Sequence, residues 1–265
     1  MFLHRLPVSI LLATLILNPL QATQSTIGGG SGLALAERAL SALITFSPIQ
    51  DVTLTGTAQR IAGSDDETGT VVFKAASTGS ARIALSLPSG TRSEIRAASP
   101  SGFVGSWSGP DGASHAIAYH NLMTDSGLFP TFMLANFISS QNAVIAYVGQ
   151  EERDGASALH LSAYQKSAGP ASEAATLPQH LSQIEIYLDP ASLVPVAIAF
   201  NTHPDDNALV DIPVSIEFSD YRKVNGAQIP FHIQKFINYS LALDLKFQTA
   251  TINSGLSASD FSAGL

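Results

Sequence analysis

Histidines are the first candidates for chemistry in this sequence, which contains seven of them. His115 and His120 are five residues apart, so in a strand they point to opposite faces and are poorly placed to share a metal ion. The run from His203 to Asp206 combines an imidazole with carboxylates, which are potential cation ligands. A solvated turn between two strands is the simpler interpretation of this run.

The other histidines have weaker signals. His160 and His180 have no carboxylate at a useful spacing, and His232 is expected on the polar, solvent-facing side of its strand. We therefore expect no metal site. The acidic runs at residues 65–67 and 151–152 lie in turn-like regions and are interpreted as exposed, while carboxylate pairs that meet only in the fold stay open.

One short run approaches the G-x-S-x-G pattern of a nucleophilic serine on a strand-to-helix turn. It reads Gly105-Ser106-Trp107-Ser108-Gly109, so Trp107 stands where the serine would be required. The glycine run at residues 28–32 does not predict a phosphate-binding loop, because it follows no strand and no lysine follows it. We expect a protein that is not an enzyme and that holds no cofactor.

Composition excludes several classes of partner. The 265 residues include 13 Lys+Arg and 21 Asp+Glu, a net charge of −8, and the basic residues are scattered. This pattern offers no patch for nucleic acid or anionic lipid headgroups. Cysteine is absent, which excludes disulfides, thiol chemistry and lipid attachment to cysteine. Charged residues make up 13% of the chain and hydrophobic residues 45%, which indicates a large buried apolar surface.

The N-terminus has the pattern of a secretory signal peptide. A short positive start precedes an apolar run at residues 6–17, and small residues follow it. We expect residues 1–22 to be a signal peptide, 23–32 a Gly/Ser-rich linker and 33–265 a single domain. The protein is then periplasmic or secreted. The alternative is that the apolar run stays as an uncleaved anchor.

Two helices and one long loop are predicted from composition and spacing. Residues 33–44 repeat leucine and alanine at helical spacing. Residues 128–139 form the second predicted helix, with Pro130 in the first turn, where proline is tolerated. Residues 167–179 are rich in Ala, Ser, Pro and Gly and are predicted to be a loop.

Most of the remaining chain alternates apolar and polar residues, which predicts a meander of about ten antiparallel strands with one apolar face. The alternation is cleanest after residue 181 and least clear between residues 98 and 125. Asn225-Gly226 predicts a type I′ hairpin, because both residues tolerate positive φ. Pro230 has no N–H to donate, so it predicts a sheet edge or a bulge in the following strand.

The apolar face of such a sheet must be covered. Two helices of about 12 residues extend only about 18 Å each. They would therefore cover part of a curled sheet and leave an apolar hollow between sheet and helices. A two-sheet sandwich with a dry core is the alternative.

Four features of the chain carry a family resemblance. They are an early helix before a strand meander, the segment PTFML in the second helix, the run YLDPASLVPVAIAF followed by IEFSDYRKVNGAQIPFHIQKF, and an ending in which Gly255-Leu256 precedes Asp260-Phe261. On these features the chain resembles the LolA/LolB-like family of bacterial lipoprotein carriers. The resemblance covers residues 33–262.

The resemblance implies a mainly β (α+β) fold, a curved antiparallel half-barrel whose apolar concave face is covered by a few helices around a cavity for acyl chains. Such a cavity needs apolar walls, because each buried CH₂ group contributes about 0.8 kcal/mol. Ordinary core packing is the alternative role for every residue at this face. We expect the cavity lining to include Leu40, Leu43, Phe73, Leu85, Phe132, Met133, Phe137, Ile186, Ile198, Phe218 and Phe231.

The resemblance also implies a contact between an arginine and the covering segment, and Arg82 lies in roughly the matching strand. The absence of cysteine departs from the membrane-anchored members. The implied function is therefore binding of a hydrophobic small molecule or lipid acyl chains, with a transient membrane-protein or lipoprotein partner. The oligomeric state stays open, because the edges of an open sheet can associate. The alternatives are an exported interaction module without a ligand cavity and a hydrolase whose residues meet only in the fold.

Overall fold

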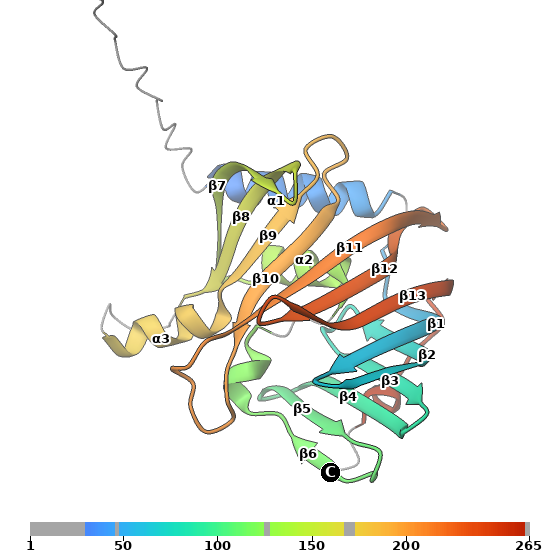
Figure 1. Cartoon of the computed structure of the whole chain (residues 1–265). Coiled ribbons are helices and arrows are strands. Elements are labelled where there is room, and N and C mark those ends of the chain that lie inside the picture. Colours follow the sequence, from blue (N-terminus) through green and yellow to red (C-terminus); the bar gives the residue numbers. More distant parts are fainter. Residues whose placement is uncertain (1–29, 46–47, 125–127, 167–172, 263–265) are drawn as a thin grey trace, which may run out of the picture.

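A computed structural model of the chain describes residues 30–45, 48–124, 128–166 and 173–262 (Figure 1). In these ranges the chain forms one antiparallel sheet of thirteen strands, three α-helices and two 3₁₀ helices. The sheet is curved and unclosed, and this confirms the predicted half-barrel and excludes the two-sheet sandwich. The expected signal peptide lies outside the described residues.

The helices and strands follow one another along the chain as a long meander with two helical interruptions. The helices are α1 (Gly30–Leu43), η1 (Tyr119–Leu122), α2 (Pro130–Ser139), α3 (Glu173–Ser182) and η2 (Ala258–Phe261). The strands are β1 (Asp51–Ala62), β2 (Asp65–Ala76), β3 (Ala81–Leu87), β4 (Gly90–Ser99), β5 (Gly102–Ser108), β6 (Ser114–Ala116), β7 (Ala143–Arg153), β8 (Ala156–Gln165), β9 (Ile184–Leu188), β10 (Pro195–Thr202), β11 (Ile212–Val224), β12 (Ala227–Ile237) and β13 (Ser240–Ile252).

Both predicted helices are confirmed, and two other expectations need correction. The linker predicted for residues 23–32 extends too far, because α1 already begins at Gly30. Gly32 lies in this helix against the β7 backbone, where a Cβ atom would come within 2.4 Å of the Ile145 carbonyl oxygen. The loop predicted for residues 167–179 contains the start of α3, which carries Pro178 inside it.

The order of strands in the sheet is β6-β5-β4-β3-β2-β1-β13-β12-β11-β10-β9-β8-β7. The first and last strands of the chain therefore pair in the middle of the sheet, whereas the consecutive strands β6 and β7 lie at opposite edges. The chain between these two edges must cross a face of the sheet. We call residues 117–142 the crossing segment; its described parts include η1 and α2. In Figure 1, α2 lies inside the curl of the sheet.

The concave face is the one on which α1 and α2 pack, through contacts with β7 and β12. A single large cluster of buried apolar side chains gathers there and draws on both helices and on strands of both halves of the sheet. The hairpin prediction is confirmed, because Asn225 and Gly226 have φ angles of 46° and 88°. Pro230 lies on β12, which pairs with β13 only from His232 onward, so this proline occupies a local edge.

Candidate functional site

The concave face bears a small, partly open cavity of about 50 Å³. A water molecule occupies about 30 Å³, so this space holds one or two waters and no larger ligand. The cavity lies between the two halves of the curled sheet and is bordered by Leu128 of the crossing segment. Its other lining residues are Phe73, Ala81, Ile83, Glu94, Arg96, Phe200, Ile216, Lys235 and Leu243.

The predicted cavity residues all reach the concave core, but most of them fill it. Ten of the eleven are buried members of the main cluster, and Leu40 packs against that cluster. Of the eleven, Phe73 borders the small cavity. Sequence reasoning did not select Ile83, Phe200 and Ile216, although the period of two marks all three as apolar positions of their strands. Which apolar position borders empty space depends on the curl of the sheet.

Arg96 on β4 holds the crossing segment from one half of the sheet. Its side chain is buried, and the guanidinium donates hydrogen bonds to the carbonyl oxygens of Gly79, at 2.8 Å, and Leu122, at 3.1 Å. The guanidinium carbon also lies 3.2 Å from the centre of the Phe103 ring. Leu122 ends η1 and packs on β5, where Gly105 leaves room for its side chain. A buried cation thus fixes the end of η1.

The expected contact between Arg82 and the segment that covers the concave face is not formed, because Arg82 lies on the outer face. Arg82 is paired with Lys74 across β2–β3, and together with Val72 and Ala84 these residues line a hollow on the outer face. Its neighbour Ala81 faces the concave side and is paired with Arg96. Adjacent residues in a strand point to opposite faces, so Arg96 faces the concave side and Arg82 does not.

A second set of polar contacts holds the crossing segment at the other half of the sheet. The Asn121 side chain accepts a hydrogen bond from the backbone N–H of His203 and donates one to its carbonyl oxygen, both at 2.8 Å. The ring of His120 lies 3.1 Å from the Pro204 carbonyl oxygen. These contacts join η1 to the loop between β10 and β11. The crossing segment is therefore fastened to both halves of the sheet by polar groups.

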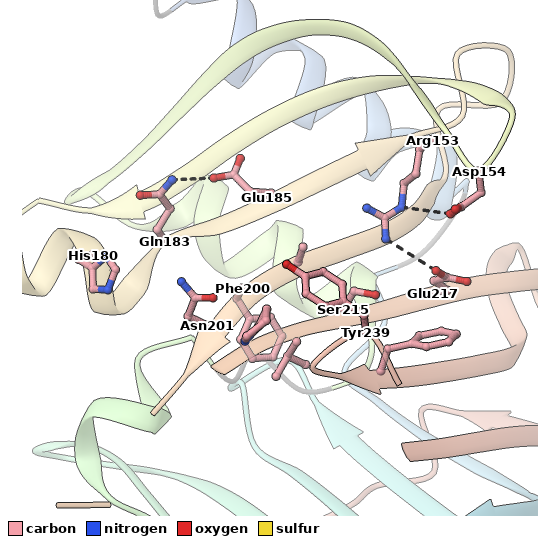
Figure 2. Close-up of a pocket in the computed structure, with 14 residues that line it drawn as sticks. Arg153, Asp154, His180, Gln183, Glu185, Phe200, Asn201, Ser215, Glu217 and Tyr239 are labelled. Carbon is pink, nitrogen blue, oxygen red and sulfur yellow. Dashed lines mark hydrogen bonds and ion pairs between the residues drawn. The ribbon is translucent and has the colours of Figure 1, made fainter. Parts of the chain in front are cut away.

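A large hollow lies on the outer face, beside α3 and strands β9 to β11 (Figure 2). Its volume is about 640 Å³, and Figure 2 shows four charged residues on its border, which are Arg153, Asp154, Glu185 and Glu217. Arg153 lies 3.7 Å from Glu217, and Gln183 donates a hydrogen bond of 2.6 Å to Glu185. The rings of Phe200, Phe236 and Tyr239 also border this hollow, so its lining combines charged and apolar groups.

Comparison with known proteins identifies the architecture. No protein-family model matches the sequence, and no curated protein matches it significantly. Solved structures do match: a domain named for outer membrane lipoprotein sorting from Vibrio parahaemolyticus (TM-score 0.56, 12% identity) and a LolA superfamily protein from Nitrosomonas europaea (TM-score 0.53, 10% identity). Each match covers 88% of this chain and 97% of the other. A DUF1329 family protein from Desulfovibrio piger matches with TM-score 0.57, 12% identity and coverages of 88% and 96%.

The fold is LolA-like. This confirms the architecture that the sequence resemblance implied, and at identities of 10–12% it establishes the fold alone. In the described ranges, no helix is both long and apolar enough to cross a membrane.

The outer face of the LolA-like sheet carries histidine–carboxylate pairs that spacing in the sequence did not reveal. His160 has no carboxylate at a useful spacing in the sequence, but in the fold it lies 2.7 Å from Glu185 and 3.3 Å from Glu151. Burial raises the pKa of Glu185, but hydrogen bonds from His160, Gln183 and Ser162 outweigh it and lower that pKa. The carboxylate is the centre of this group and contacts both Ser162 and His160, whereas a catalytic triad requires serine to contact histidine.

A second group on the outer face does have the order of contacts of a triad. The Ser219 hydroxyl lies 3.0 Å from His232 Nδ1, and His232 Nε2 lies 2.6 Å from the Asp244 carboxylate. The three residues lie on the adjacent strands β11, β12 and β13. A hollow of about 500 Å³ adjoins His232, with Arg222 and Lys246 on its border. His232 lies on the outer face, as the sequence predicted, with 25% of its side chain exposed, and it is paired with a carboxylate.

Proposed function

We propose that this chain is an exported, non-catalytic carrier or sensor that binds a hydrophobic ligand, such as a lipid acyl chain, between the concave face of its sheet and the crossing segment. The observation that carries the proposal is an apolar concave face whose cover is fastened at both sides by polar contacts. Each CH₂ group of a ligand that is buried against apolar walls contributes to the free energy of binding. The LolA-like fold supports the proposal, since one structural neighbour is named for lipoprotein sorting.

The 50 Å³ cavity represents the closed form of this carrier. Ligand pockets usually measure about 300–1,000 Å³. An acyl chain must therefore displace part of the crossing segment, with Leu128 among the residues that move, while the sheet stays paired. The polar contacts of Arg96 and Asn121 are the interactions that such opening would break.

The test is lipid binding by the purified protein. We expect mass spectrometry of an organic extract to detect co-purified lipid, and a fluorescent fatty-acid probe to bind and to be displaced by unlabelled fatty acid. Ile216→Trp fills the cavity and should weaken probe binding about tenfold or more, at a cost in stability of about 1–3 kcal/mol. Val72→Trp, at a position 40% exposed on the outer face, is the matched control.

Absence of both co-purified lipid and probe binding would refute the carrier proposal. The small cavity would then favour an exported interaction module without a ligand site. Equal probe binding by Ile216→Trp and Val72→Trp would show that the probe binds outside the concave face.

One observation favours a second function, hydrolysis at the group formed by Ser219, His232 and Asp244. A positioned base can activate a serine, and Asp244 orients the histidine. However, Ser219 lies within β11, whose backbone N–H groups serve the sheet, so side chains such as Arg222 would have to stabilise an oxyanion. The test is hydrolysis of nitrophenyl esters by the wild-type chain. Loss of this hydrolysis in Ser219→Ala, with activity kept in Ser215→Ala, would establish the function. Absence of hydrolysis, or hydrolysis that Ser219→Ala leaves unchanged, would exclude it.

A further inference from the structure

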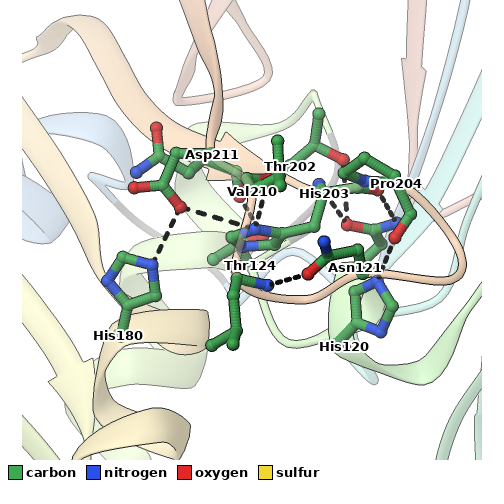
Figure 3. A network of polar contacts seen from close by, with 12 residues as sticks. His120, Asn121, Thr124, His180, Thr202, His203, Pro204, Val210 and Asp211 are labelled. Atoms are coloured by element: carbon green, nitrogen blue, oxygen red, sulfur yellow. Dashed lines mark hydrogen bonds and ion pairs between the residues drawn. The ribbon is translucent and has the colours of Figure 1, made fainter.

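Three potential metal ligands meet where α3 approaches the loop between β10 and β11 (Figure 3). His180 lies in the last turn of α3, His203 directly follows β10, and Asp211 directly precedes β11. One ligand atom from each residue lies within 4.8 Å of the other two. Figure 3 shows both rings beside the Asp211 carboxylate.

Two of the three distances between these atoms are close to those around a tetrahedral ion, and the third is at most 4.8 Å. Asp211 Oδ1 lies 2.9 Å from His180 Nε2 and 3.5 Å from His203 Nδ1. Zinc bonds to nitrogen and oxygen are about 2.0–2.1 Å, which places neighbouring ligands of a tetrahedron about 3.3 Å apart. Small side-chain rotations would therefore bring all three ligands around one ion.

His203 is the buried member of this group. Its side chain is completely buried, and its Nε2 atom has no hydrogen-bond partner. Its Nδ1 atom lies 3.1 Å from the Val210 carbonyl oxygen as well as facing Asp211. Coordination of an ion through Nδ1 would replace the hydrogen bond to the Val210 carbonyl oxygen. Asn121 holds the backbone of His203 on both sides, which fixes the ring in this position.

The group is also accessible from solvent. The side chains of His180 and Asp211 are 42% and 44% exposed, and His180 borders the outer hollow of Figure 2. An ion can therefore enter without local unfolding, and a water molecule can complete its coordination.

We propose that His180, His203 and Asp211 form a binding site for a divalent transition-metal ion, with Zn²⁺ as the preferred ion. Two imidazoles and one carboxylate suit Zn²⁺, whereas Ca²⁺ and Mg²⁺ prefer oxygen ligands. The ion replaces the proton shared by His180 and Asp211. It joins α3 to the loop that Asn121 connects to η1, and this role requires no lipid ligand.

The test is metal binding by the full chain without a polyhistidine tag, after treatment with a chelator. Co²⁺ titration reports a tetrahedral site through its visible absorption, and competition with a chromophoric chelator gives the affinity for Zn²⁺. We expect one Zn²⁺ per chain. Asp211→Asn and His180→Gln should each weaken binding about tenfold or more. His160→Gln is the matched control, because it removes another histidine–carboxylate pair of similar length from the outer face.

The proposal is overturned if the wild-type chain takes up no Zn²⁺, or if Asp211→Asn and His180→Gln bind it as tightly as His160→Gln does. Circular dichroism of each variant confirms that it is folded. Both outcomes are independent of lipid binding, so failure of the carrier proposal would not affect this result.

Discussion

Replacement of Arg96 by methionine is the sharpest test of how the crossing segment is held. Arg96 is 7% exposed, and its guanidinium donates to two backbone carbonyl oxygens, those of Gly79 and Leu122. Methionine keeps much of the apolar stem but donates nothing. The variant therefore leaves these two oxygens without the donors that join the β2–β3 turn and the end of η1 to β4.

The expected loss follows from the contacts. A hydrogen bond to a charged group contributes about 1.5–3 kcal/mol, so the two bonds together contribute about 3–6 kcal/mol. Methionine avoids the cost of burying a guanidinium, which offsets part of this amount. We expect the free energy of unfolding of Arg96→Met to fall by about 3 kcal/mol, which lowers the midpoint of thermal unfolding by about 6–12 °C in a domain of this size.

Urea unfolding measures this loss, and Arg82→Met is the matched control. Arg82 lies on the outer face of the neighbouring strand, so its replacement should change stability by less than about 0.5 kcal/mol. Arg96→Met should also admit the fluorescent fatty-acid probe faster, because one fastening of the crossing segment is gone. Equal losses of stability in the two variants, or a larger loss in Arg82→Met, would refute this account of Arg96.

Three further changes test other contacts. Gly32→Ala places a Cβ atom 2.4 Å from a β7 carbonyl oxygen. The free energy of unfolding in urea should therefore fall by about 1–3 kcal/mol, despite the better helix propensity of alanine. A rise in this free energy would contradict the close packing. Asp51→Asn weakens the four hydrogen bonds that residues 254–256 donate to this buried carboxylate. The free energy of unfolding, measured in the same assay, should fall by about 2 kcal/mol or more. An unchanged urea midpoint would mean that this contact is dispensable. The hydrogen bond from Lys74, followed by hydrogen bonds from Ser257, lowers the pKa of Asp260 from 3.8 to about 2. The stability that this lowered pKa provides is complete at pH values above the unfolded pKa of 3.8 and is lost as the pH falls towards 2. Unfolding midpoints of the wild-type chain should therefore drop across that pH window, and those of Lys74→Met should drop less. Identical pH profiles of the two proteins would exclude the ion pair as the cause.

The sequence predicted the fold well wherever a local pattern determines the structure. The alternation after residue 181 and the Asn225-Gly226 turn identified strands and a hairpin that the structure confirms. The pattern was weak in residues 98–125, where β5 and β6 are short and η1 interrupts the sheet. The start of α3 was missed, because small residues and Pro178 gave it the composition of a loop.

The sites were harder to predict, because they depend on register and on long-range contact. Arg82 and Arg96 are both arginines on early strands. Which of them faces the crossing segment depends on which residues of each strand point to the concave side, and a shift of one residue in this alternation reverses the prediction. His160 meets Glu185, and His180 meets Asp211, across 25 and 31 residues of chain. Such pairs have no spacing signal, since the register between β8 and β9 and the placement of α3 bring them together.

The topology explains why a cover that can open is compatible with a stable sheet. Because β6 and β7 lie at opposite edges, the crossing segment must span the concave face, and it is held there by Arg96 on one half and by Asn121 on the other. Neither contact belongs to the strand ladder, so breaking both would leave all thirteen strands paired. The proposed metal site acts on the second contact, since His203 is both a metal ligand and the partner of Asn121. If both proposals hold, metal binding should slow the entry of the fatty-acid probe in the wild-type chain and leave the rate unchanged in Asp211→Asn.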